Sequence, residues 1–468
     1  MIELKPVTGR LIDDLRFVVG EKYVLIAEEE REAYSCDESP ISKPHLPDLV
    51  IKPWNSEEVA KVLALANEAR VPVTPRGGGT GLSGGTVPTL GGIVLSLERM
   101  NRIKEIDEEN FVAVVEPGVM LKDLRQEAET RGFYYPVYPG EGTAHIGGNV
   151  ATNAGGMQAV KYGVTRNFVM GLEAVLPTGE IIRTGGKLVK CSTAYDLTQL
   201  IVGSEGTLAV ITEITLRLEI PPKSRQILYI PFPGPHQAIK AVPQILKLGV
   251  PLTGLEFMER DAIEIVEEYL EREVPYHEHE AFLLAILDGN SEEEVNNAAH
   301  CIADVCMAND AVEVYVPMGE RATRELLEAR EKLYHALKHS GPIEVVDVVV
   351  PRSRIADFVD RVKEIGERYR IPIIGVGHAG DGNVHLQPLG RGVPKDEWER
   401  KLPELLKEIY RVGASMGGTI SGEHGLGSEK KAYLNLAVDR EQIALMARLK
   451  QSFDPNGILN PGKVFDAE

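Results

Sequence analysis

The chain has 468 residues, enough for about two or three domains and a large buried core. It contains 70 Asp and Glu against 51 Lys and Arg, so its formal net charge is −19. This charge repels nucleic-acid phosphates and anionic lipid, which excludes binding to either as the main activity and requires a local positive centre for any anionic substrate.

The first half of the chain predicts mixed α and β structure. Asn55 or Ser56 caps an expected helix whose apolar residues follow the i, i+3, i+4, i+7 spacing, at Val59, Val62, Leu63 and Ala66. Strands are expected at residues 71–74, 92–97, 111–115 and 172–176, the last followed by a hairpin turn at 177–180. Glycine is concentrated in residues 77–92 and 140–206, where we expect the backbone to wrap around a ligand.

The pattern changes at Pro221-Pro222, where the glycine density falls. Beyond this point helices and strands alternate, which predicts a second α+β domain. We expect strands at 282–287, 312–316 and 345–350, and helices that begin after Ser291 and cover 320–337 and 355–369. A helix-rich part runs from about Pro394 to the end.

The loop at residues 76–86 contains six glycines and two threonines, so it exposes many backbone N–H groups and no bulky side chain. Such a loop suits a diphosphate, which needs several donors at once. Residues 79–84 formally match the dinucleotide fingerprint, but the following Gly-Thr-Val-Pro does not begin a helix, which argues against a Rossmann site. A flexible glycine loop is the alternative.

Four motifs in this half resemble, in order and spacing, the FAD-binding segments of the vanillyl-alcohol-oxidase-type or PCMH-type flavoproteins. They are residues 75–86, Glu-Pro-Gly-Val at 116–119, the Gly/Asn-rich segment at 147–156, and Gly-Ser-Glu-Gly-Thr-Leu at 203–208. The resemblance implies an α+β fold: a two-subdomain FAD-binding domain at 1–222 with its core at about 41–222, an α+β substrate or cap domain at 223–410, and a C-terminal helical segment at 411–468 that returns to the FAD domain.

In this family the first loop binds the diphosphate, and the later segments line the rest of FAD. The implied FAD contacts in this chain are Arg76, Gly77, Gly78, Gly79, Thr80, Gly81, Gly84, Pro139, Thr143, Gly147, Gly148, Asn149, Asn153, Gly156, Glu205, Gly206, Ile211 and Asn460. Some relatives attach the flavin to a histidine or cysteine near the first loop. Residues 75–86 contain neither, so we expect non-covalent FAD.

Two later motifs contain three of the 11 histidines. His378 and His385 flank a Gly-Asp-Gly-Asn turn, so the arms of a hairpin can bring both imidazoles to one ion. Glu423 would complete a site of two histidines and one carboxylate, with positions left for substrate oxygens. A histidine on a strand more often forms an ordinary hydrogen bond, and this alternative stays open.

These motifs and residues 453–463 resemble the D-2-hydroxyacid dehydrogenase branch, which includes D-lactate dehydrogenase, the glycolate oxidase flavin subunit and D-2-hydroxyglutarate dehydrogenase. The likeness begins at about residue 40 and implies that His378, His385 and Glu423 bind a divalent metal, with His424 as the catalytic base. We expect zinc, with iron or manganese as alternatives. Relatives hold the substrate carboxylate with a helix arginine, for which Arg330 is the candidate; a solvated charge on the helix face is the alternative.

This combination predicts FAD-dependent, metal-assisted oxidation of a D-2-hydroxy acid, with D-lactate favoured, to the 2-oxo acid. A divalent ion lowers the pKa of the substrate hydroxyl, and an imidazole can accept the proton near neutral pH. The hydride then passes to the flavin. Alternatives are glycolate or D-2-hydroxyglutarate as substrate, a metal-free flavin alcohol oxidase, and a non-catalytic flavin subunit that only relays electrons.

The sequence contains no second redox centre, because its four cysteines are too few and too scattered for a cluster. We therefore expect electrons to pass to a separate protein, such as an electron-transfer flavoprotein or an iron–sulfur subunit. No apolar run approaches the roughly 20 residues that span a bilayer. The expectation is a cytoplasmic enzyme that binds no nucleic acid and can dock on a membrane-bound respiratory partner; a homo-oligomer is compatible with the sequence.

Overall fold

The computed structural model describes residues 4–466 and divides into two compact units. The first unit contains the chain up to Gly155, residues 164–221 and the chain from Glu423 onward, and the second contains residues 156–163 and 222–422. The sequence predicts that the chain returns to the FAD-binding domain at residue 411. Residues 411–422 stay with the second unit because helix α13 (Lys395–Ser415) continues past 410 and Thr419 pairs with Val349.

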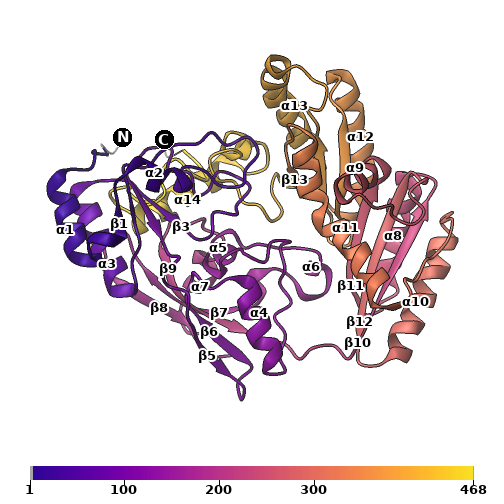
Figure 1. The fold of residues 1–468 in the computed structure, drawn as a ribbon, viewed down its shortest axis with the longest axis horizontal. Helices are drawn as coiled ribbons and strands as arrows, with labels where there is room; N and C mark the ends of the chain where they lie inside the picture. Colours follow the sequence, from indigo (N-terminus) through magenta and orange to yellow (C-terminus); the bar gives the residue numbers. More distant parts are fainter. Residues whose placement is uncertain (1–3, 467–468) are drawn as a thin grey trace. The chain divides into compact units, whose positions relative to one another are not determined.

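The first unit contains two sheets, which form its two subdomains (Figure 1). One has the order β1-β2-β4-β3, with β3 and β2 both parallel to β4, and the other is antiparallel with the order β5-β6-β9-β7-β8. The strands are β1 Val24–Leu25, β2 Leu49–Ile51, β3 Val73–Arg76, β4 Ile93–Ser96, β5 Ile103–Asp107, β6 Val112–Val115, β7 Val169–Val175, β8 Ile181–Gly185 and β9 Val210–Arg217. The helices are α1 Gly9–Val19, α2 Glu28–Arg31, α3 Ser56–Ala69, α4 Leu121–Thr130, α5 Ile146–Thr152, α7 Leu197–Ile201 and α14 Arg440–Phe453.

Helix α3 confirms the pattern from which it was predicted. The Asn55 side chain accepts a hydrogen bond from the Glu58 N–H and caps the helix. All four predicted apolar positions are buried in one cluster with residues of β2, β3 and β4. The helix ends where Arg70 adopts a left-handed backbone conformation with φ of 57°.

The C-terminal segment of the first unit runs along β3. The Val73 N–H donates to the Ile458 carbonyl at 2.8 Å, and the Asn460 N–H donates to the Val73 carbonyl at 2.7 Å. Leu459, between them, is fully buried in the same core cluster as α3. The end of the chain therefore lies against the strand that leads into the glycine-rich loop.

The second unit is built on a six-stranded antiparallel sheet with the order β10-β12-β11-β14-β15-β13. The strands are β10 Ser224–Phe232, β11 Leu252–Glu259, β12 Ala281–Gly289, β13 Val346–Val349, β14 Ile373–His378 and β15 Asn383–Pro388. The helices, besides α13, are α6 Ala159–Tyr162, α8 Pro235–Lys247, α9 Arg260–Leu270, α10 Glu292–Met307, α11 Gly319–Ser340 and α12 Ile355–Tyr369.

Helices cover this sheet on both faces, because alternate residues of each strand point to opposite sides. Residues such as Tyr229, Phe282 and Val376 form a core with α9 and α11 on one face. Helices α8, α10 and α12 contact the same strands from the other face (Figure 1). The structure thus confirms the α+β fold expected for this part of the chain.

The predicted strand at 312–316 is wrong. Only Tyr315 pairs with the sheet, through a bridge to Tyr229 of β10. The Val312 N–H donates to the Pro231 carbonyl, but a proline has no N–H with which to return the bond. The ladder therefore stops after one bridge.

The short segment 156–163 belongs to the second unit because a buried acid holds it. Asp288 of β12 is fully buried, forms an ion pair with Lys161 and accepts a hydrogen bond from the Tyr162 hydroxyl at 2.9 Å. Two partners satisfy a charge that would otherwise be costly to bury. Within residues 4–466, no helix has the length and apolarity needed to cross a membrane.

Replacing Leu459 by Ala should destabilise the full-length protein by about 2–5 kcal/mol, because the substitution leaves a cavity in the core beneath β3. The matched control is Leu445→Ala, at a side chain on α14 that is 49% exposed, for which we expect less than about 1 kcal/mol. Urea unfolding measures both, and equal shifts of the midpoint would contradict the docked position of the C-terminal segment.

Candidate functional site

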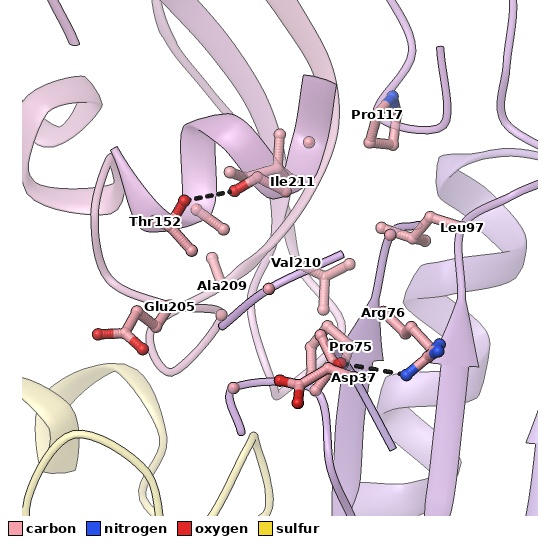
Figure 2. A pocket seen from close by; sticks show the side chains of 18 of the residues that line it. Asp37, Pro75, Arg76, Leu97, Pro117, Thr152, Glu205, Ala209, Val210 and Ile211 are labelled. Atoms are coloured by element: carbon pink, nitrogen blue, oxygen red, sulfur yellow. Dashed lines mark hydrogen bonds between the residues drawn. The ribbon is translucent and has the colours of Figure 1, made fainter. Parts of the chain in front are cut away.

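A pocket in the first unit brings together segments that are far apart in the sequence (Figure 2). The glycine-rich loop after β3 forms one wall, and α5 with the start of β9 forms another. Its lining residues are Asp37, Pro75, Arg76, Gly77, Gly81, Ser83, Gly85, Thr86, Leu97, Pro117, Gly147, Gly148, Ala151, Thr152, Glu205, Gly206, Ala209, Val210 and Ile211. These segments are the ones from which FAD binding was predicted.

Eight of the residues expected to contact FAD line this pocket: Arg76, Gly77, Gly81, Gly147, Gly148, Glu205, Gly206 and Ile211. Others lie in the same segments or beside them without lining it: Gly78, Gly79, Thr80, Gly84, Pro139, Thr143, Asn149, Asn153 and Asn460. Gly156 belongs to the second unit. The contacts of these residues with FAD remain predictions.

The residues around the pocket fit a polar cofactor. Asn149 on α5 is buried, and its Nδ2 has no hydrogen-bond partner among the described residues. The same holds for Oδ1 of Asn460, whose Nδ2 donates to the carbonyls of Gly85 and Glu205. Buried polar atoms are rarely left unpaired, so these two atoms and the glycine-lined wall suit a ligand rich in hydrogen-bonding groups.

Arg76 uses its guanidinium to hold the loop. Its Nη1 donates to the Cys36 carbonyl at 2.6 Å and to the Thr86 hydroxyl at 3.1 Å. The Arg76 side chain therefore links the start of the loop to its end at Thr86. Backbone N–H groups are then the donors that this wall offers to a diphosphate.

Glu205 connects the pocket to the Glu-His motif. Its buried carboxylate accepts the N–H groups of Leu426 and Gly427, each at 2.8 Å. Burial raises the pKa of Glu205, and these two donors offset the effect only in part. The Ser83 hydroxyl donates to the His424 carbonyl at 3.0 Å, so the motif is fixed to the glycine-rich loop from a second side.

Glu423 and His424 are adjacent in the chain, with His424 Nε2 3.8 Å from Glu423 Oε1. Both side chains are mostly buried, at 13% exposure. A Cβ atom on Gly155 would lie 2.7 Å from a carboxylate oxygen of Glu423 and 3.2 Å from its Cβ, so the glycine lets the Glu423 side chain pack closely against the backbone here.

The two other predicted metal ligands lie in the second unit on one hairpin, as expected. His378 ends β14 and His385 lies on β15, with their ring centroids 5.3 Å apart. His378 Nδ1 lies 2.8 and 2.9 Å from the two carboxylate oxygens of Glu256 on β11. A carboxylate accepts the Nδ1 proton, which leaves the His378 Nε2 lone pair available to a metal.

Glu256 also binds Arg330 of α11. It is fully buried, and its Oε2 lies 2.8 Å from Arg330 Nε and 2.6 Å from Nη2. Burial raises the pKa of Glu256, but the nearby charges of His378 and Arg330 outweigh this effect and lower it below the ordinary value. The Arg330 side chain is only 13% exposed, so it is not a solvated charge on the helix face.

A second buried acid, Asp347, lies on β13, which pairs with the β15 strand of the hairpin. It accepts hydrogen bonds from Asn383 Nδ2 at 2.8 Å, the Ser421 hydroxyl at 2.8 Å and the Gly422 N–H at 2.9 Å. Its Oδ1 also lies 3.8 Å from Nδ1 of His385. Gly422 is the last residue of the second unit, so Asp347 fixes the chain directly before Glu423.

Sequence reasoning missed Glu256 and Asp347. Each is an acid on a buried, mostly apolar strand, at Leu252–Glu259 and Val346–Val349. An acid in such a position needs a cationic or N–H partner, so it is a signal that could have been used. The sequence does not show which residues are the partners, because the pairing of the strands decides which side chains meet.

The second unit also fits a divalent metal. Two imidazoles of one hairpin, with carboxylates bonded to or beside their Nδ1 atoms, form a nitrogen and oxygen donor set suited to Zn²⁺, Fe²⁺ or Mn²⁺. Carboxylates in this role orient the imidazole and raise its basicity. The arrangement therefore has both candidate ligands and the groups that would orient them.

Comparisons with known proteins agree with this picture. The model of an FAD binding domain matches residues 47–185, and that of the C-terminal domain of FAD linked oxidases matches residues 221–464. The chain is 44% identical over 436 residues to a D-lactate dehydrogenase of Archaeoglobus fulgidus, covering 92% of this chain and 95% of that protein. It is 42% identical over 437 residues to a glycolate oxidase subunit of Bacillus subtilis, covering 93% and 92%.

Among solved structures, p-cresol methylhydroxylase superposes with a TM-score of 0.81 at 16% identity, covering 100% of this chain and 99% of that chain. A likeness at this identity concerns the fold. The two family models and the two sequence relatives show, in addition, to which family the chain belongs. The chain therefore belongs to the FAD-linked oxidases, with a PCMH-type FAD-binding domain followed by an α+β cap domain.

Proposed function

We propose that this protein oxidises a D-2-hydroxy acid, with D-lactate favoured, to the 2-oxo acid, using FAD and a divalent cation. The observation that carries the proposal is the shared use of Glu256 by His378 and Arg330. One buried carboxylate orients an imidazole suited to a metal and a guanidinium suited to a substrate carboxylate. An α-hydroxy acid presents a hydroxyl and a carboxylate side by side.

The proposed metal ligands are His378, His385 and Glu423, with zinc as the expected ion and iron or manganese as alternatives. His378 would bind through Nε2, because its Nδ1 faces Glu256. Glu423 follows Gly422, whose N–H is held by Asp347. When bound, a divalent cation lowers the pKa of an alcohol that it coordinates and neutralises part of the substrate charge.

The glycine-rich loop and α5 would bind the diphosphate of FAD through backbone N–H groups, with Asn149 and Asn460 supplying side-chain contacts. FAD supplies the hydride acceptor, flavin N5. The pocket walls formed by Leu97, Val210 and Ile211 are apolar, which suits the exclusion of water from a flavin ring (Figure 2).

His424 would remove the hydroxyl proton of the substrate. Its backbone carbonyl is bonded to Ser83 and the following N–H groups to Glu205, so the backbone that carries the imidazole is fixed at two points. Fixing a base in place lowers the entropic cost of reaching the transition state. Histidine is the residue type most often used as a general base in enzymes, which suits His424 to this role.

Arg330 would bind the substrate carboxylate. Its Nε and Nη2 contact Glu256, which leaves Nη1 as the nitrogen not used in this pair. The net charge of −19 opposes the approach of an anion, so a guanidinium held in place is the local positive centre that the substrate needs. D-Lactate is favoured over glycolate and D-2-hydroxyglutarate because the Archaeoglobus fulgidus relative is named for it.

Electrons would leave the reduced flavin for a separate protein, an electron-transfer flavoprotein or an iron–sulfur subunit. All four cysteines are free, and the exposed and buried ones do not form a cluster within the part of the chain that the structure describes. A metal-free flavin alcohol oxidase remains the competing function. It would need no carrier protein, because oxygen would reoxidise the flavin.

Anaerobic addition of D-lactate to the purified yellow protein should bleach the flavin absorbance, and L-lactate should not. Glycolate and D-2-hydroxyglutarate complete the panel and rank the substrates. Treatment with a chelator should abolish bleaching while the bound flavin stays, and Zn²⁺ or Mn²⁺ should restore it. Bleaching that survives chelation, with no metal found by elemental analysis, would favour the metal-free oxidase.

His424→Ala should slow anaerobic flavin reduction by about 10²–10⁴-fold, the usual contribution of a general base. The loss should be smaller at high pH, where solvent can take the proton. The control is His300→Ala, at an exposed position on α10. FAD content, read from the absorbance spectrum, should be unchanged in both variants. An unaltered reduction rate in His424→Ala would point to a flavin subunit without catalysis.

Arg330→Lys should raise the KM for D-lactate by about tenfold or more, with a smaller change in kcat. Lysine keeps the charge and can still pair with Glu256, but it lacks the planar fork that holds two carboxylates at once. Arg321→Lys is the matched control, because Arg321 lies on the same helix with its side chain 92% exposed. An equal KM in both variants would remove Arg330 from the substrate site.

A further inference from the structure

An acid occupies the wall of the pocket assigned to FAD. Asp37, in the stretch between α2 and β2, lines this pocket beside the glycine-rich loop (Figure 2). A Cβ atom on Gly81 would lie 3.7 Å from its Oδ2, so this oxygen faces the middle of the loop. The loop is suited to a diphosphate, which carries negative charge, and an ionised carboxylate beside it would repel the same ligand.

The two oxygens of Asp37 differ in their surroundings. Oδ1 accepts the Ser39 N–H at 3.2 Å. Oδ2 is buried and has no partner in good hydrogen-bond geometry among residues 4–466, although the Gly84 N–H of the loop lies close enough to the carboxylate to lower its pKa slightly. A buried carboxylate oxygen without a donor is costly, whereas a carboxylic acid in this place has a proton to give to a ligand.

No nearby cation neutralises this acid directly. Arg76 attracts it, but the Arg76 guanidinium donates to the Cys36 carbonyl and Thr86. Glu429 of the C-terminal segment repels Asp37, and Lys463 of the same segment attracts it. Glu205, the other acid of the pocket, differs from Asp37 in that both of its carboxylate oxygens accept a backbone N–H.

We propose that Asp37 binds FAD as a neutral carboxylic acid, with Oδ2 donating a hydrogen bond to a cofactor oxygen, so that FAD affinity falls as the pH rises. No earlier step of the proposed reaction uses this side chain, and the proposal does not depend on which alcohol is oxidised. It makes Asp37 a residue that sets cofactor affinity.

The direction of the pH effect follows from linkage. Burial raises the pKa of Asp37 to about 6, and the Ser39 N–H and Arg76 offset this only in part. Below that pH the proton is already in place when FAD binds. Above it, each binding event must take up one proton, so the Kd rises about tenfold per pH unit. Burial also lowers the pKa of Lys463 to about 8, so measurements should stop at about pH 7.5.

The test uses the holoenzyme. Diluting it releases FAD, whose fluorescence recovers in solution and gives the Kd. We expect the Kd to rise about 20-fold between about pH 5.5 and 7.5, as expected for one proton with a pKa of about 6. Asp37→Asn, which keeps a donor in place of the acid, should bind FAD with little pH dependence and at pH 7.5 more tightly than the unmodified protein.

Glu38→Gln is the matched control, because it removes the same charge at the neighbouring exposed position and should keep the 20-fold rise. Asp37→Ser is a second neutral variant, used if Asp37→Asn does not fold, and should also flatten the profile. A Kd that is constant or falls with pH in the unmodified protein would overturn the proposal. So would neutral variants that lose FAD at both pH values, because an ionised Asp37 would then be the binding form.

Discussion

The buried carboxylate of Glu256 is the constraint on which the second unit depends. It is fully buried, so its charge must be balanced within the protein by Arg330 from α11, while His378 from β14 adds a hydrogen bond. This pairing ties a helix on one face of the sheet to the end of a central strand. It also fixes which imidazole nitrogen of His378 carries the proton, and a fixed tautomer is what a metal ligand requires.

The same principle operates on both sides of the Glu-His motif. Within the second unit Asp347 accepts the N–H of Gly422, and within the first unit Glu205 accepts the N–H groups of Leu426 and Gly427. The chain between these anchors is only a few residues long and contains the proposed ligand Glu423 and the proposed base His424. Each anchor is a buried acid; Glu205 belongs to a motif seen in the sequence, whereas Asp347 does not.

The sequence pattern correctly predicted the elements that are determined by interactions between residues close together in the chain. Helix α3 follows from its cap and its apolar spacing, and the hairpin carrying His378 and His385 follows from a glycine-rich turn between apolar runs. Contacts between residues far apart in the chain determine the features that the sequence pattern did not predict. Residues 312–316 alternate like a strand, yet their neighbour Pro231 cannot complete a ladder. Residues 156–163 look like part of a glycine-rich loop, yet Asp288 holds them in the second unit. Glu256 and Asp347 were missed for the same reason.

The distribution of charge explains how so acidic a protein can handle anions. The proposed sites do not use a field from the whole molecule, which is repulsive at a net charge of −19. They use groups held rigidly at short range: backbone N–H groups of the glycine-rich loop for a diphosphate, and the Arg330 guanidinium for a carboxylate. Donors that act at contact distance lose less strength to salt screening than a field from distant surface charges does. Selection of ligands therefore rests on geometry, and the acids around each site act as anchors for the donors.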